Sequence, residues 1–333
     1  MGFRDREKQR QSKLGVEFFE NDVLGGNYRK TSRFFCLNEW RKNLCKPYRE
    51  PAIQYFRNRG ITWHDGGNEI RKNDLPSNHL CCSQSCCVNF NFPFMNDKTG
   101  LKDFLNNLGY SVKEVLPIIL DKDENEPIHN YIGFEWIGEK NYLRERVKKN
   151  AQRTRGEYFT SADFIIRFRQ EDDTVRILLG EWKYTENYPK DRCIRYSRSK
   201  TDRLNEIYRP TLEAHNCQIH IDSNKYEDLF YDPFDQLMRL QLLATKMEEE
   251  REMQADIVST IHIAPKANKE FNRRITSPGL CEYGDTVHTI WEALISNDRF
   301  KGFYLEDMLS IYCEAYQDDA VRKYMQIRYG NMR

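Results

Sequence analysis

The stretch that decides the fold is SADFIIRFRQEDDTVRILLGEWKYTE, residues 161–186. It predicts two β-strands joined by a polar turn at residues 170–174, because apolar side chains recur with a period of two on both sides of the turn. One face of the first strand carries Ala162, Phe164, Ile166 and Phe168, and one face of the second carries Val175, Ile177 and Leu179.

Three ionisable residues interrupt this apolar pattern. Asp163 lies with Ile165 on the other face of the first strand, and Glu181 and Lys183 end the apolar face of the second. If the strands pair as a hairpin, Asp163 approaches Glu181, and two carboxylates and a lysine meet at one edge of the sheet. Carboxylates bind hard cations, and such a cation beside an ammonium group suits the hydrolysis of a phosphodiester. The alternative is a structural cross-strand charge pair, which contributes only about 0.2–1 kcal/mol.

The spacing of these residues resembles a known motif. Asp163, seventeen intervening residues and then Glu181-x-Lys183 are similar to the PD-(D/E)XK nuclease motif, with Ser161 and Ala162 in place of its proline. The strings EWKYTE at 181–186, YDPFDQLMR at 231–239 and HIAP at 262–265 resemble a group of restriction-endonuclease-like proteins. The resemblance covers residues 76–310, and the extended strings are more specific than the three motif residues alone.

The resemblance implies roles for the site residues. Asp163 and Glu181 would hold Mg²⁺, for which Mn²⁺ can substitute, and the backbone carbonyl of Trp182 would be a further ligand. Lys183 would orient or deprotonate the attacking water, a task suited to the lowered pKa that desolvation gives a lysine.

Further residues extend this predicted site. The resemblance implies another acid upstream, for which Glu135 and Glu145 are candidates, although a solvated salt bridge is an equal alternative for Glu145. Gln236 would hydrogen-bond the phosphate or a metal-bound water, the alternative being a glutamine on a helix surface. Glu186 and Tyr188 are weaker candidates at the same site.

The elements around the hairpin predict an α/β fold with a mixed central sheet flanked by helices, like a restriction-endonuclease core. A strand is predicted at 131–137, a charged helix at 141–152, a helix at 201–215 interrupted at Pro210, and a strand at 257–263. A further helix is predicted to start with Asp232 as N-cap and Pro233 as first residue and to run to residue 250. We expect an N-terminal accessory region at 1–128, with a cysteine-rich segment, and a nuclease core with C-terminal helices at 129–333.

The accessory region gives weaker signals. Residues 1–15 are polar, which predicts a frayed end, 33–60 predict short helices, 64–78 a loop, and 99–108 a helix that ends at Gly109. His79 and four cysteines between 81 and 87 lack the spacing of a zinc site, so we expect no zinc. The resemblance implies small residues around Ser83 and Gln84, which favours small-residue packing of this segment. Residues 89–94 predict at most a loop or wedge near the nucleic acid.

Composition limits the class of protein. The net charge of the 333 residues is only +1, no run of 18 apolar residues predicts a membrane span, and the N-terminus has no secretory signal. Ten cysteines are too few for a disulfide scaffold and indicate a reduced, cytoplasmic protein, while 13% aromatic residues argue against disorder.

Positive charge is concentrated locally on both sides of the hairpin. Residues 140–155 hold seven Lys or Arg against one acid, and 190–203 hold six against two. Such strips suit a nucleic-acid backbone, although charge runs are often solvated helix faces. The residues expected to contact phosphates are Arg144, Lys148, Lys149, Arg153, Arg192, Arg195, Arg198 and Arg203.

These features predict a metal-dependent DNA endonuclease. The resemblance implies a role in restriction or phage defence, and a homodimer, because many such enzymes cut two strands as dimers. An RNA-cleaving or structure-selective nuclease is an alternative within the same fold. A catalytically silent nucleic-acid-binding module is an alternative from another class, and the presence of Asp163, Glu181 and Lys183 argues against it.

Overall fold

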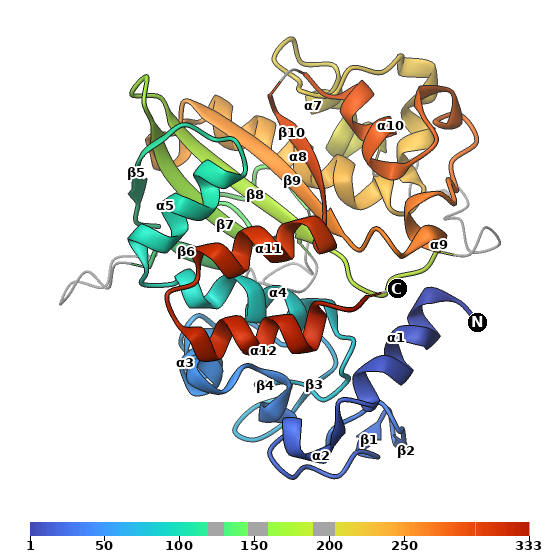
Figure 1. Cartoon of the computed structure of the whole chain (residues 1–333). Helices are drawn as coiled ribbons and strands as arrows, with labels where there is room; N and C mark the ends of the chain where they lie inside the picture. Colours follow the sequence, from blue (N-terminus) through green and yellow to red (C-terminus); the bar gives the residue numbers. More distant parts are fainter. Residues whose placement is uncertain (119–129, 146–158, 189–203, 297, 333) are drawn as a thin grey trace.

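The computed structural model describes residues 1–118, 130–145, 159–188, 204–296 and 298–332. A central sheet of mixed strand direction runs through it, with helices packed on both faces (Figure 1). The predicted α/β architecture is therefore confirmed. The strands of this sheet are β5 (Val112–Leu116), β6 (Ile132–Trp136), β7 (Ala162–Gln170), β8 (Val175–Trp182), β9 (Ile257–Ala264) and β10 (Phe300–Tyr304).

The strand order is β10-β9-β8-β7-β5, and β6 also pairs with β7. β8, β9 and β10 are parallel neighbours, whereas β7 is antiparallel to β8, β5 and β6. β5 and β6 lie along the same side of β7, β5 opposite residues 167–170 and β6 opposite residues 162–166. The end of β7 that begins at Ala162 therefore lies between β6 and β8.

The β7–β8 hairpin has the predicted turn and faces. The amide of Gln170 donates to the carbonyl of Thr174 at 2.8 Å, and Phe164 lies opposite Gly180. The Phe164 ring lies so close to the backbone at position 180 that only glycine fits there, because a Cβ atom would lie 2.0 Å from a ring carbon of Phe164. This contact keeps the register that continues to Asp163 and Glu181.

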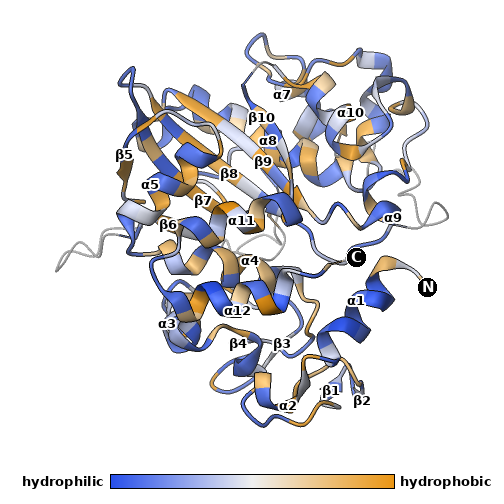
Figure 2. Cartoon of the chain, viewed as in Figure 1, coloured by the Kyte–Doolittle hydropathy of each residue, from blue (hydrophilic) through white to orange (hydrophobic). Residues whose placement is uncertain are grey.

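Each face of the hairpin contributes to a separate core. Helix α4 (Ser83–Asn91) packs on β7 and β8 from one side, and α8 (Phe234–Glu249) packs on β8 and β9 from the other. The first core contains Phe164, Ile166, Phe168 and Leu178, and the second contains Ile165, Ile177 and Leu179. Burial of both faces explains why apolar residues occur on both sides of β7 and β8. Figure 2 shows hydrophobic residues along the sheet strands.

Several predicted elements need correction. α8 begins at Phe234, one residue later than predicted, so Pro233 is the N-cap and no side chain caps the helix. Residues 89–94 are not a loop or wedge near the nucleic acid, because they lie buried in α4 and in the 3-10 turn Phe92–Phe94. The predicted helix at 201–215 is a π-helical turn, Leu204–Tyr208, followed by α7 (Arg209–Leu212), which includes Pro210.

The N-terminal end is a helix, so the prediction of a frayed end was wrong. α1 (Phe3–Ser12) is mainly hydrophilic in Figure 2, yet it buries Phe3, Glu7 and Gln11. Hydrogen bonds rather than apolar packing hold the two buried polar residues. Glu7 accepts from the hydroxyl of Tyr184, and Gln11 donates to the same hydroxyl at 2.8 Å and to the carbonyl of Arg328 at 3.0 Å. A pattern of apolar residues cannot reveal such a helix.

The rest of the N-terminal region has little regular structure. It contains the predicted short helices near residues 40–58 and the predicted helix that ends before Gly109. Its elements are α2 (Gly15–Phe18), β1 (Asn27–Tyr28), β2 (Thr31–Ser32), 3-10 turns at Trp40–Asn43 and Lys46–Tyr48, α3 (Arg49–Asn58), β3 (Gly66–Gly67), β4 (Leu75–Ser77) and α5 (Lys98–Asn107). The predicted loop at 64–78 therefore carries two very short strands.

The C-terminal helices complete both layers. They are α9 (Lys269–Asn272), α10 (Val287–Leu294), α11 (Leu305–Ala315) and α12 (Asp319–Tyr329), with 3-10 turns at Ser223–Phe230, Glu252–Gln254 and Cys281–Tyr283. α11 and α12 pack with α4 and α5 in the first core, and α10 joins α8 in the second. α1 lies beside the end of α12, so the N- and C-terminal segments are neighbours (Figure 1).

The expected division into an N-terminal accessory region at 1–128 and a nuclease core at 129–333 stays a prediction. β5 and α5 lie before this boundary and contribute to the same sheet and the same first core as the strands that follow it. None of the helices in the described ranges combines the length and apolar character needed to cross a membrane.

Candidate active site

Three carboxylates form a row across three neighbouring strands. Phe134 lies opposite Phe164 and Trp136 opposite Ala162, so the register places Glu135 opposite Asp163. Phe164 lies opposite Gly180, so the same counting on the other side places Asp163 opposite Glu181. We call Glu135, Asp163 and Glu181 the carboxylate row.

Asp163 is the middle member of the row. Its Oδ2 accepts a hydrogen bond from the amide of Trp182 at 2.6 Å, which fixes the carboxylate against β8. Burial, the charge of Glu181 and the charge of Glu135 together raise the pKa of Asp163 well above its usual value, and neither Lys183 nor the Trp182 amide outweighs them. Asp163 therefore lies where negative charge is concentrated and incompletely neutralised.

Glu135 joins the row through an unusual backbone conformation. Its φ is +50°, in the left-handed region that costs a non-glycine residue about 1–2 kcal/mol. Two hydrogen bonds hold its carboxylate, from Gln84 Nε2 and from the Ser161 hydroxyl, both at 2.8 Å. Burial and the charge of Glu181 still raise the pKa of Glu135.

Lys183 lies beside the row. Its Nζ is 2.7 Å from Glu181 Oε1 and also donates to Gln236 Oε1. Burial alone would lower the pKa of Lys183, but the charge of Glu181, with smaller contributions from Tyr188 and Glu186, raises it well above the usual value. The prediction of a lowered lysine pKa was wrong, because it considered burial without this contact, and Lys183 is a cation.

Helix α8 supplies polar residues above the sheet. Gln236 lies in its first turn, where it reaches Lys183. Arg239, three residues later, lies on the same side, pairs with Asp235 at 3.1 Å and donates to the Thr160 hydroxyl at 3.3 Å. We did not predict Arg239, although its spacing of three residues from Gln236 is a signal for a shared helix face.

The second upstream acid, Glu145, does not join the carboxylate row. It is buried, and it accepts hydrogen bonds from the amide and hydroxyl of Thr160, both at 2.7 Å, and from the Tyr208 hydroxyl at 3.1 Å. Residues 141–145 contain a turn rather than the start of the predicted helix. Glu145 therefore has neither the predicted helical setting nor a place in the cleft that contains Asp163 and Glu181.

Most residues of the two predicted basic strips lie outside the described residues. Arg144 is described and exposed. The remaining predicted phosphate contacts, Lys148, Lys149, Arg153, Arg192, Arg195, Arg198 and Arg203, lie outside the described residues.

The carboxylate row opens into a cleft of about 900 Å³. One wall comes from the sheet and α8, and includes Gln236, Glu186 and Tyr188. The other wall comes from the N-terminal region, including Arg4, Lys8, Tyr28, Trp63, His64 and His79. This second wall was not predicted, because it depends on contacts between residues far apart in the chain.

The cysteine-rich segment lies beside this cleft. Ser83 and Gln84 begin α4, where the Ser83 hydroxyl donates to Glu186 and Gln84 binds Glu135. Cys81, Cys86 and Cys87 are buried, and burial raises the pKa of each thiol. The expectation that this segment holds no zinc stays a prediction.

The donor set of the carboxylate row fits a magnesium ion. Among the described residues, no group of three or more His, Cys, Asp or Glu is arranged to hold a metal ion by itself. Mg²⁺ needs less, because it binds through one or two carboxylates and keeps several waters. The raised pKa of Asp163 beside two further carboxylates shows a surplus of negative charge, which a divalent cation would offset.

One protein family matches nearly the whole chain. The family described as restriction endonuclease associating with ARP matches residues 6–330. The chain belongs to that family. Membership indicates a nuclease, and thus a hydrolase. No curated protein and no solved structure matches the chain.

Proposed function

We propose that this restriction-endonuclease family member is a metal-dependent endonuclease of the PD-(D/E)XK type that hydrolyses DNA phosphodiester bonds. The observation that carries the proposal is the position of Asp163 opposite Glu181, with Lys183 Nζ 2.7 Å from Glu181. Glu135 adds a third carboxylate from the neighbouring strand. Family membership supports a nuclease independently of this geometry.

Asp163 and Glu181 would hold Mg²⁺ or Mn²⁺, with Glu135 and the Trp182 carbonyl as further candidate ligands. When bound, the ion would supply Lewis-acid polarisation of the phosphoryl oxygen and lower the pKa of water. Lys183, kept as a cation by Glu181, orients the attacking water and stabilises negative charge developing on the phosphoryl oxygens. Gln236 restricts the Lys183 ammonium through its hydrogen bond, which reduces reorganisation during the reaction.

The biological setting is also a proposal. Restriction or defence against phage fits the family, and the association with ARP for which the family is named is proposed for this chain as well. A homodimer is proposed on the ground that cutting both strands of a duplex calls for two active sites.

The test is a cleavage assay with supercoiled plasmid, linear duplex, single-stranded DNA and RNA, each with Mg²⁺, Mn²⁺ or EDTA. We expect cleavage of DNA with either metal and none with EDTA or in a Glu181→Gln variant. Cleavage of RNA alone would replace DNA as the substrate. Binding without cleavage of any substrate would overturn the nuclease and indicate a silent binding module.

A further inference from the structure

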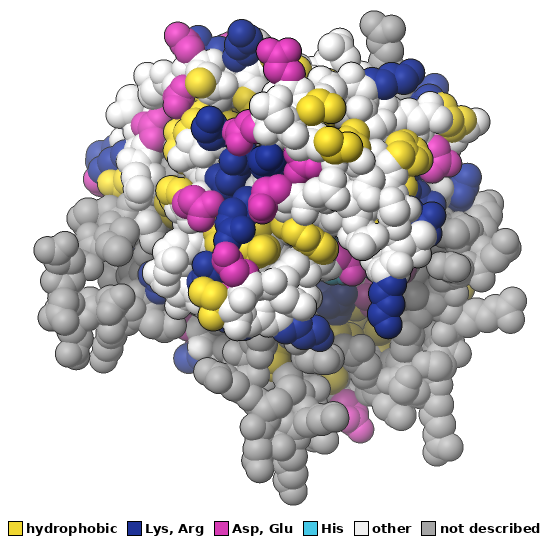
Figure 3. All heavy atoms as spheres, turned by 90° about the horizontal axis from the view of Figure 1, so that it is seen from below, with side chains coloured by type: hydrophobic (Ala, Val, Ile, Leu, Met, Phe, Trp, Pro, Cys, Tyr) yellow, Lys and Arg dark blue, Asp and Glu magenta, His cyan; other side chains and the backbone are white. Residues whose placement is uncertain are grey.

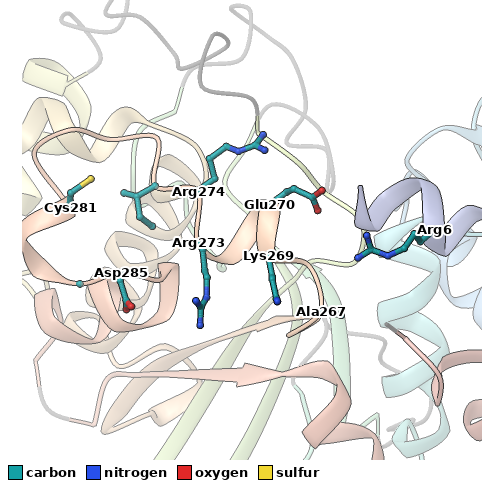
Figure 4. A pocket seen from close by; sticks show the side chains of 10 residues that line it. Arg6, Ala267, Lys269, Glu270, Arg273, Arg274, Cys281 and Asp285 are labelled. Carbon is teal, nitrogen blue, oxygen red and sulfur yellow. The ribbon is translucent and has the colours of Figure 1, made fainter. Parts of the chain in front are cut away.

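A cavity of about 960 Å³ lies between α1 and residues 267–285, but its charged side chains do not converge on one point (Figure 4). Figure 4 shows Lys269 and Arg273 pointing to one side of it and Arg274 to the opposite side. Glu270 in the same cavity is engaged by the amide of Phe3 at 3.1 Å. The active-site cleft is the stronger candidate for a binding site, because the opposite flank of α1 places its charged side chains in one wall of the cleft.

Helix α1 presents three different sides. At 3.6 residues per turn, Phe3, Glu7 and Gln11 form its buried side, and these three residues are buried. The same period places Arg4 and Lys8 together on one flank and Arg6 and Arg10 on the other. Arg4 and Lys8 line the active-site cleft, whereas Arg6 lines the cavity between α1 and residues 267–285.

The buried side fixes α1 to the strand that carries the site. Glu7 accepts a hydrogen bond from the hydroxyl of Tyr184, the residue that follows Lys183, and Gln11 donates to the same hydroxyl at 2.8 Å. Arg10 pairs with Glu7 and holds the carboxylate in place. These contacts set the position of Arg4 and Lys8 relative to the carboxylate row.

Arg4 and Lys8 differ from the other cations of the cleft, which are already paired. Those are Lys183 with Glu181, Arg239 with Asp235, and Arg29 with Asp65. Neither Arg4 nor Lys8 makes an ion pair within the described part of the chain, and Lys8 Nζ lies 4.2 Å from the centroid of the Phe35 ring. Burial and the charge of Arg4 lower the pKa of Lys8, and burial and the charge of Lys8 lower that of His79 to about 4.

The outer face of the N-terminal region shows the opposite arrangement. Figure 3 shows Lys or Arg and Asp or Glu side chains gathered next to one another on this face. Arg41 and Arg57 both pair with Glu69, and Arg57 also pairs with Asp74 at 3.0 Å. Arg41 and Arg57 are thus neutralised within the protein, whereas Arg4 and Lys8, two like charges one helical turn apart, repel each other and are available to an external anion.

We propose that Arg4 and Lys8 bind consecutive phosphates of the nucleic-acid strand that lies in the active-site cleft, so that α1 acts as a backbone clamp beside the carboxylate row. Residues four apart lie about 6 Å apart along a helix axis, so the two cations can contact separate phosphates of one strand. Backbone contacts of this kind position the strand without selecting its sequence. The inference rests on the proposed nuclease function.

The test compares two double variants that each remove two positive charges. Arg4→Gln/Lys8→Gln removes the clamp, and Lys13→Gln/Lys72→Gln removes two exposed cations that do not line the cleft. Each is made in full-length Glu181→Gln protein, and its Kd for a labelled duplex and a labelled single strand is measured across a salt series. We expect the slope of log K against log salt to fall by about 1.8 for the duplex and about 1.4 for the single strand in the clamp variant, and not in the control.

Cleavage by the same double variants without Glu181→Gln provides a second measurement. We expect the clamp variant to raise KM with kcat unchanged, and Arg4→Lys/Lys8→Arg to restore binding. If wild type cleaves and the clamp variant keeps the salt slope of the control, the clamp is overturned while the nuclease stands. If the Glu181→Gln parent binds no nucleic acid and wild type cleaves none, both proposals fail. Thermal unfolding of each variant checks that the fold is intact.

Discussion

Both ends of strand β8 carry a buried charged residue, but the two residues differ in the contacts that neutralise their charge. At the hairpin end of β8, Arg176 is 2% exposed, and its guanidinium group is hydrogen-bonded within the protein. It donates to Gln170 at 2.7 Å, to Ser259 at 3.2 Å and to the carboxylate and carbonyl of Asp298. At the other end, Lys183 is the cation in contact with the carboxylate row.

This difference separates a structural charge from one available for chemistry. The Arg176 end satisfies its donors within the protein, so it needs no ligand. The other end keeps three carboxylates in one row, and burial and mutual repulsion raise the pKa of Asp163 and Glu135. In the sequence the two ends look alike, because each is a charged residue in an apolar strand. Only the contacts in the structure distinguish them.

The largest expected effect comes from the carboxylate row. Asp163→Asn and Glu181→Gln should each lower the rate of plasmid cleavage by about 10²–10³-fold or more, because each removes charge that would hold the metal ion. Glu145→Gln is the matched control, a buried acid outside the cleft, and should keep the wild-type rate while losing about 1–2 kcal/mol of stability. Wild-type turnover by Asp163→Asn would contradict the assignment.

A substitution at the Arg176 end of β8 should change the stability of the protein rather than the cleavage rate. Arg176→Met removes the hydrogen bonds that Arg176 donates to Gln170 and Ser259, so the free energy of unfolding should fall by about 1–3 kcal/mol. The cleavage rate at 25 °C should stay at the wild-type value, since the folded protein still dominates. Urea unfolding and plasmid cleavage measured on the same preparation test both parts. A large loss of rate without a loss of stability would erase the distinction between the two ends.

A smaller effect is expected from the support of Glu135. Gln84→Ala removes one of the two hydrogen bonds that hold this carboxylate, so cleavage should fall by about 10-fold, the lower limit for an outer partner of a metal ligand. The apparent affinity for Mg²⁺ should fall with it, so a higher concentration of the ion should recover part of the rate. No dependence of the deficit on Mg²⁺ concentration would show that Gln84 acts elsewhere.

The smallest effect is a pH-dependent gain of stability in Asp163→Asn without metal. The pKa of Asp163 in the folded protein is raised above its unfolded value of about 3.9, so the folded state binds more protons between these two values. Wild-type stability therefore falls as pH rises through that window, and asparagine removes this loss. In EDTA, the Tm of the variant should equal that of wild type near pH 4 and exceed it by about 1–3 °C near pH 8. A constant difference across pH would contradict the raised pKa.

The hairpin was predictable because its information is local. Alternation along residues 161–186, with the two strands paired as a hairpin, was enough to expect Asp163 near Glu181. Glu135 was expected only from the family resemblance, as one of two candidate acids. The pKa of Lys183 was not predictable, since its direction depends on a 2.7 Å contact rather than on burial. Gln84 is 51 residues from Glu135, and Glu7 is 177 residues from Tyr184, so no local pattern connects them.

The central claim is that Asp163 and Glu181 together bind a divalent cation. Calorimetric titration of Mg²⁺ into the full-length protein at pH 7 tests it directly, with Asp163→Asn, Glu181→Gln and Glu145→Gln alongside wild type. We expect saturable binding to wild type and Glu145→Gln, and loss of that binding in both cleft variants. Unchanged Mg²⁺ binding by Asp163→Asn or Glu181→Gln, or absence of binding by wild type, would contradict it.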